Sequence, residues 1–200
     1  RYDRAGESHF NMLSAYHKAL RGSDPDGALY WMARMLEGGE DPRILFRRAL
    51  AMAAEDIGLA DPNALLMAVS ARSAFEVLGA PEGYLPLAEM TIYLATAPKS
   101  NSTVAALGAA LAAARETPAA PVPLHLRNAP TGLMKDLGYG VGYRYAHDAP
   151  GHFAAQEYLP EVLRGRALYQ PGALGFEVKV AERLARWRKE AATGSDKPAE

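Results

Sequence analysis

Three Asp-Pro dipeptides in the first third of the chain constrain its fold more than any other feature. They are Asp24-Pro25, Asp41-Pro42 and Asp61-Pro62. An Asp that precedes a helix accepts hydrogen bonds from N–H groups of the first turn, and a Pro at the first helical position loses nothing by lacking an N–H. The spacing of the dipeptides leaves room each time for one helix and a short turn. The pattern therefore predicts consecutive antiparallel helices.

The residues between these dipeptides support the same interpretation. Phe10, Leu13 and Leu20 recur at helical spacing and share one face. Gly58 and Gly79 stand where preceding helices are expected to end. Alanine is abundant and the strand-forming Val and Ile are scarce before residue 176. We therefore predict an all-α fold, an up-and-down helical array.

Two further helices are expected over residues 81–95 and 100–115. The second is nearly all Ala, Leu and Gly over its central part. A helix with small residues on every face allows close backbone approach, which indicates burial inside the fold or against another subunit. The candidates for a subunit interface are Ala105, Ala106, Ala109, Ala110 and Ala113.

The composition changes at a proline-rich connector over residues 117–123. A short helix is expected near 131–137, and a long Gly- and Tyr-rich loop region over 138–171. Within this loop we expect a short strand at 167–169, as part of a strand pair before the last helix at 176–189.

The domain organisation follows from these elements. Residues 1–116 are expected to form the helical array. Residues 117–190 are expected to form the connector, an ordered loop region and a final helix packed on the array. The polar residues 191–200 are expected to be a disordered tail. Because the chain begins at Arg1 and not at Met, we expect it to be part of a longer protein.

Charge and composition exclude several classes of function. The 22 Lys and Arg nearly balance the 23 Asp and Glu, so no bulk field can hold DNA or an acidic membrane nonspecifically. The chain has no Cys, which removes disulfides, thiolate nucleophiles and thiolate zinc sites. No apolar run approaches the roughly 20 residues of a membrane span, so no membrane partner is expected.

The sequence motifs of common enzyme classes are incomplete or absent in this chain. Gly22 and Gly27 have the spacing of a phosphate loop, but Ala28 and Leu29 stand where Lys and Ser or Thr are needed. No Gly-x-Ser-x-Gly or His-Glu-x-x-His occurs, and no two histidines pair at helical metal-ligand spacing. We therefore expect no catalytic residue, no metal site and no cofactor in this chain.

One stretch, residues 124–148, gathers Arg, Asn and Tyr side chains on irregular backbone. Such groups can bind phosphates or stack on bases. They can equally satisfy backbone polar atoms of a long loop, with the tyrosines anchoring it. The candidates for contact with DNA or a partner protein are Arg127, Asn128, Lys135, Tyr143 and Arg144.

Several long strings in this chain carry a family resemblance. They are SAYHK at residues 14–18, YLATAPKSN at 93–101, PLHLRNAPT at 123–131 and YAHD at 145–148. Together with shorter matches they cover nearly all of residues 2–182. The chain resembles the C-terminal part of the replication-associated recombination protein A family of AAA+ ATPases, which includes the Werner-helicase-interacting protein of eukaryotes.

The resemblance implies a function. The segment is expected to be the clamp-loader-like helical collar that follows the ATPase lid and makes the family a homotetramer. The full-length protein is expected to be a cytoplasmic, nucleoid-associated, DNA-dependent ATPase that acts at stalled forks in replication, recombination and repair. Its ATP and Mg²⁺ would bind in an N-terminal part absent from this chain. Its partners would be forked or single-stranded DNA and single-stranded-DNA-binding protein. The alternative function is contact with that DNA or that protein through residues 125–148.

Overall fold

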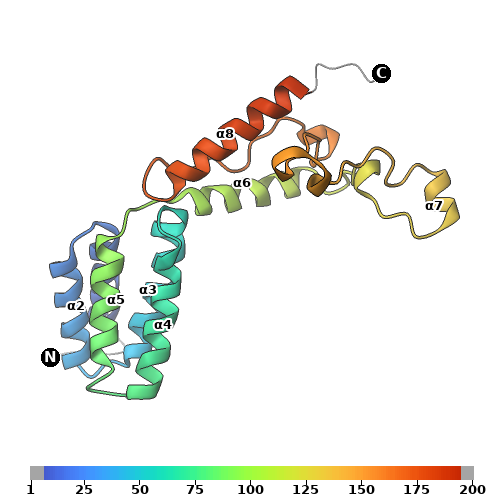
Figure 1. The fold of residues 1–200 in the computed structure, drawn as a ribbon. Coiled ribbons are helices and arrows are strands. Elements are labelled where there is room, and N and C mark those ends of the chain that lie inside the picture. The colour runs from blue at the N-terminus through green and yellow to red at the C-terminus, as the bar shows by residue number, and fades with distance from the viewer. Residues whose placement is uncertain (1–6, 195–200) are drawn as a thin grey trace. The chain divides into compact units, whose positions relative to one another are not determined.

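The computed structural model describes residues 7–194, and this part of the chain contains helices and no strand (Figure 1). The all-α prediction is therefore confirmed. The α-helices are α1 (Glu7–Arg21), α2 (Pro25–Glu37), α3 (Pro42–Met52), α4 (Asn63–Leu78), α5 (Tyr84–Thr96), α6 (Ser102–Glu116), α7 (Gly132–Asp136) and α8 (Glu177–Gly194). None of the helices in the described residues is long and apolar enough to cross a membrane.

The chain divides into two compact units. Of the described residues, the first unit contains 7–105 and 171–178, and the second contains 106–170 and 179–194. Helices α6 and α8 each begin in the first unit and continue into the second.

The helix starts of the first unit depend on the Asp-Pro dipeptides. The Asp24 carboxylate accepts a hydrogen bond from the Gly27 N–H at 2.9 Å, and the Asp41 carboxylate accepts one from the Arg43 N–H at 2.9 Å. Asp61 accepts from the Asn63 N–H at 3.0 Å. Each carboxylate satisfies a first-turn donor that the helix leaves without a partner. The three predicted starts are confirmed to within two residues.

The core of the first unit lies among α1 to α5, of which α2 to α5 are labelled in Figure 1 and run side by side. Its largest fully buried side chains include Tyr16, Phe46, Leu45 and Leu94. The buried Tyr16 hydroxyl lies 3.0 Å from Thr91 Oγ1, whose own hydroxyl donates to the Leu87 carbonyl at 2.8 Å. Burial of this phenol is therefore accompanied by a hydrogen bond, as a buried polar group requires.

The buried Tyr16 phenol is expected to make the first unit less stable at alkaline pH. Burial raises the pKa of Tyr16 to about 12, against about 10 in an unfolded chain. The folded state holds this proton more tightly, so the stabilisation is complete below pH 10 and is lost as the pH rises towards 12. We expect the free energy of unfolding in urea to fall by about 3 kcal/mol from this group across that range.

Tyr16→Phe isolates the effect, because it removes the titrating group and keeps the ring. Urea unfolding of both proteins at pH 9, 10 and 11 should show a shallower pH dependence for the variant. Equal slopes for the two proteins would contradict the assignment of the alkaline loss to Tyr16.

Residues 171–178 complete the first unit. The Phe176 N–H donates to the Ala60 carbonyl at 2.8 Å, and the fully buried Glu177 carboxylate accepts from the Ser102 hydroxyl. Gly175 has φ +58°, and a Cβ at this position would overlap the Ala60 carbonyl oxygen. Glycine is therefore required where the segment approaches Ala60.

The second unit is mostly irregular. Short 3-10 helices occur at Leu124–Leu126, Ala146–Asp148, Pro150–His152 and Glu161–Leu163. The strand expected at 167–169 is absent from the described residues, and this expectation was wrong. The Tyr169 carbonyl accepts instead from the Arg188 guanidinium on α8 at 3.1 Å, so a side chain takes the place of a neighbouring strand.

The last helix is longer than expected. Helix α8 continues to Gly194, because Glu190 and the two alanines that follow it are good helix formers. Residues 191–194 are therefore helical, although they were expected to belong to the disordered tail. Residues 195–200 of that tail lie outside the described residues. On α8, the Trp187 ring stacks on Phe153 with ring centroids 5.8 Å apart.

Candidate functional site

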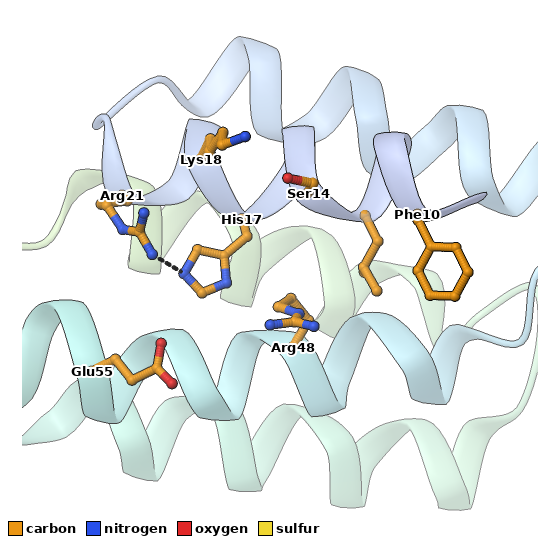
Figure 2. A pocket seen from close by; sticks show the side chains of 8 residues that line it. Phe10, Ser14, His17, Lys18, Arg21, Arg48 and Glu55 are labelled. Atoms are coloured by element: carbon orange, nitrogen blue, oxygen red, sulfur yellow. Dashed lines mark hydrogen bonds between the residues drawn. The ribbon is translucent and has the colours of Figure 1, made fainter. Parts of the chain in front are cut away.

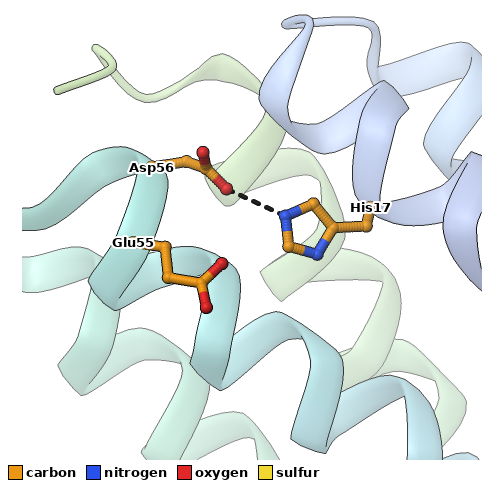
Figure 3. Close-up of side chains that lie close together, drawn as sticks. All are labelled: His17, Glu55 and Asp56. Carbon is orange, nitrogen blue, oxygen red and sulfur yellow. Dashed lines mark hydrogen bonds and ion pairs between the residues drawn. The ribbon is translucent and has the colours of Figure 1, made fainter. Parts of the chain in front are cut away.

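A polar cluster joins α1 to the turn that follows α3. The His17 ring nitrogen Nε2 lies 2.9 Å from Asp56 Oδ2 (Figure 3). The Arg21 Nε–H donates to Asp56 Oδ1 at 2.8 Å. Arg21 Nη2 also lies 2.9 Å from His17 Nε2. One carboxylate therefore holds two residues from successive turns of α1.

Asp56 reaches this position through unusual local geometry. Residues Ala53–Ile57 form η1, one turn of π-helix that continues α3, and Gly58 follows with φ +50°. Successive residues of a π-helix diverge less around the axis than those of an α-helix, and π-turns are frequent at functional sites. In Figure 3 the side chains of Glu55 and Asp56 both extend towards His17.

A cavity of about 350 Å³ opens beside this cluster, between α1 and α3 (Figure 2). Its lining side chains are Phe10, Leu13, Ser14, His17, Lys18, Arg21, Arg48 and Glu55. The His17 side chain is only 8% exposed. Its second ring nitrogen, Nδ1, is buried without a hydrogen-bond partner among the described residues. The cavity therefore combines cationic groups with a buried imidazole that has one free nitrogen.

The same cluster brings together three residue types that bind metals. One ligand atom from each of His17, Glu55 and Asp56 can be chosen so that all three lie within 4.8 Å of one another. However, Asp56 and His17 already contact each other, and the Arg21 guanidinium contacts both. A metal ion would have to displace this cation, so the arrangement fits a cation poorly.

Two of the residues proposed for DNA or partner contact have structural roles in the loop. Arg127 donates to the Val122 carbonyl at 2.7 Å and to the Tyr139 hydroxyl at 3.1 Å, and its guanidinium lies over the Tyr139 ring. Arg144 donates to the Ala155 carbonyl at 3.0 Å. Such contacts fit the second interpretation of residues 124–148, in which side chains satisfy backbone groups of a long loop.

The other three candidates in this stretch are surface residues. Asn128, Lys135 and Tyr143 are all exposed in the second unit. Of the three cationic side chains proposed for contact, Arg127 and Arg144 are therefore hydrogen-bonded within the loop. Among the described residues, Lys135 is the one that is not.

The alanine candidates on α6 occupy different environments. Ala105 is exposed, Ala106, Ala109 and Ala110 are half-buried, and Ala113 is buried within its own chain. The exposed face of α6 instead carries Leu107 and Leu111, which are 61% and 50% exposed. Four residues apart, these two leucines lie on one side of the helix.

A second exposed apolar surface was missed by the sequence analysis. On α4, Leu66, Val69 and Val77 lie at helical spacing and are 63%, 49% and 86% exposed. A signal was present, because α4 is mostly apolar, with more large apolar residues than one buried face can hold. Only the helix at 100–115 was expected to offer an interface.

The described residues therefore form a helical fold with a polar cluster beside a cavity and with exposed apolar residues on two helices. The family model described as "MgsA AAA+ ATPase C terminal" matches residues 22–188, and the chain belongs to this family. The resemblance inferred from the sequence strings is confirmed.

Curated relatives agree with this assignment. The chain is 51% identical over 190 residues to "Replication-associated recombination protein A" of Coxiella burnetii, covering 94% of this chain and 43% of the relative. It is 49% identical over 186 residues to the protein of that name in Escherichia coli K12, covering 92% and 42%. It is 41% identical over 170 residues to "ATPase WRNIP1" of Dictyostelium discoideum, covering 84% and 19%. The chain therefore spans less than half the length of these relatives.

Proposed function

We propose that this chain is the assembly domain of an AAA+ ATPase that acts in DNA replication, recombination and repair at stalled forks. In this proposal it is the C-terminal collar through which four copies form a homotetramer and hold their ATPase domains in fixed register. ATP and Mg²⁺ would bind in the remainder of the protein, whose partners would be forked or single-stranded DNA and single-stranded-DNA-binding protein.

The observation that carries the proposal is the exposed apolar surface of α4 and α6. Each of these helices has large apolar side chains exposed at helical spacing, although a single chain normally buries such residues. Exposed apolar side chains grouped on one helix can mark an interaction site. A matched contact that buries about 1,000 Å² or more would be large enough for a specific assembly. The net charge of -1 adds little repulsion between identical copies.

The experiment is a measurement of absolute mass by light scattering over a concentration series at moderate salt. We expect a species of four times the chain mass of 21.5 kDa. Because closed symmetric assembly saturates, this mass should reach a plateau as concentration rises. A monomer at every concentration would contradict the proposal, and a mass that rises without limit would indicate aggregation in place of a closed assembly.

The alternative function, contact with DNA or with single-stranded-DNA-binding protein through residues 125–148, has weaker support. Arg127 and Arg144 are engaged within the loop. The contact would then depend on exposed Asn128, Lys135 and Tyr143. Since one cation neutralises about one phosphate, such a contact would be weak and only slightly salt-dependent.

A further inference from the structure

The cavity between α1 and α3 has no part in the assembly proposed above. Its polar side is built by two adjoining helical segments of the first unit (Figure 2). Lys18 and Arg21 extend from the last turn of α1, and Arg48 extends from α3. Phe10 and Leu13 form the apolar end of the cavity. Three cationic residues therefore line a space of about 350 Å³.

Two of these three cations are uncompensated. Arg21 is paired with Asp56, which is mostly buried behind the cavity. Neither Lys18 nor Arg48 forms an ion pair within the part of the chain that the structure describes. Among the described lining residues, the only acidic side chain is Glu55, which is exposed. The cavity therefore carries a surplus of positive charge.

The buried imidazole adds a polar group that points towards this space. The Asp56 carboxylate favours a hydrogen on Nε2, whereas the Arg21 guanidinium, which can only donate, favours a lone pair there, so the neutral ring can carry its hydrogen on either nitrogen. The Nδ1 atom is buried without a partner among the described residues, and in Figure 2 it lies on the side of the ring nearest Arg48, which lines the cavity. A buried nitrogen without a partner costs free energy, which a bound polar ligand would recover.

We propose that this cavity binds the phosphate group of a small ligand. Lys18 and Arg48 would contact the charged oxygens, and His17 Nδ1 would form a hydrogen bond with a further oxygen of the phosphate group. Phosphate oxygens accept charge-assisted hydrogen bonds, so one ligand would satisfy the cations and the imidazole together. The ligand chemistry is a free phosphate ion or the phosphate monoester of a nucleotide.

The test is isothermal titration calorimetry of the 200-residue chain with inorganic phosphate at pH 7 and constant ionic strength. We expect saturable binding to one site per chain. Lys18→Ala and Arg48→Ala should each weaken it about tenfold, the value of one charge-assisted hydrogen bond. Arg47→Ala is the matched control, because it removes an exposed cation from the neighbouring position of α3 that does not line the cavity. It should leave the affinity unchanged.

A second arm uses adenosine monophosphate, which separates the two sources of phosphate. Tighter binding that responds to the same two substitutions identifies a phosphate monoester as the ligand, and weaker binding identifies the free ion. The altered side chains are exposed, and thermal melts should show that each variant keeps the wild-type fold.

Three results would overturn the proposal. The first is the absence of saturable binding of either probe. The second is binding that Lys18→Ala and Arg48→Ala leave unaffected, because it would then occur elsewhere. The third is binding of a single-stranded oligonucleotide alone that depends on these two residues, which would make the cavity a contact for a nucleic-acid strand. None of these results depends on the number of copies in the assembly.

Discussion

The variant Leu107→Lys/Leu111→Lys is expected to sediment and scatter light as a single chain of 21.5 kDa, with the helix content of the wild type. The two leucines are 61% and 50% exposed in the single chain, so their replacement removes little packing within it. In an apolar contact between copies, each lysine would instead place an unpaired ammonium where water is excluded. Such a buried charge costs several kcal/mol, enough to dissociate the assembly.

The matched control is Val162→Lys, which introduces the same charge at an apolar residue that is 67% exposed and lies outside α4 and α6. It should keep the wild-type mass. A second test, Leu66→Lys/Val69→Lys on α4, reports whether that surface takes part as well. An unchanged mass in both double variants would contradict assembly through these helices. Replacing Ala109 or Ala110 is a poorer test, because both are half-buried in their own chain and a large side chain would disturb folding and assembly together.

The helix starts were predictable because their cause is local. Asp24 and Asp41 accept hydrogen bonds from N–H groups only two or three residues further along the chain. A sequence window of that length contains both partners. The same reasoning explains why the all-α class followed from composition and periodicity alone.

The candidate cavity could not be predicted, because its parts meet only through tertiary packing. His17 and Asp56 are 39 positions apart, and the π-turn that orients Asp56 has no sequence signal of comparable strength. Nothing in the sequence around Arg48 marks it as a residue that lines a cavity. Sequence alone did not relate it to Lys18 on another helix.

For the loop residues, the sequence showed the chemical type of each side chain but not its contacts. Arg127, Asn128 and Arg144 have the chemistry of nucleic-acid contacts, but a sequence does not reveal whether a guanidinium is already engaged. The structure places Arg127 on the Val122 carbonyl and Arg144 on the Ala155 carbonyl. An irregular loop needs such donors for its unpaired carbonyls, and this requirement competes with any external partner.

Asp56→Ala is expected to lower the free energy of unfolding of the first unit by about 2–4 kcal/mol, as loss of one partner from a buried polar pair does. The substitution removes the acceptor for both His17 and Arg21. The His17 ring has no partner at Nδ1 among the described residues, so Nε2 would keep its contact with the Arg21 cation after losing the carboxylate. Burial lowers the pKa of Lys99, and the Asp56 charge opposes this effect, so the variant also disfavours the charged Lys99.

Urea unfolding monitored by circular dichroism measures the loss, and Glu55→Ala is the matched control. Glu55 is the neighbouring carboxylate on the same π-turn, but it is exposed, and no hydrogen bond to it is found within the described residues. Its removal should change stability by less than about 0.5 kcal/mol. Comparable losses in the two variants would contradict the role given to Asp56. In the double variant His17→Ala/Asp56→Ala, the two losses should not add, because the second substitution removes a group that the first has already left without its partner.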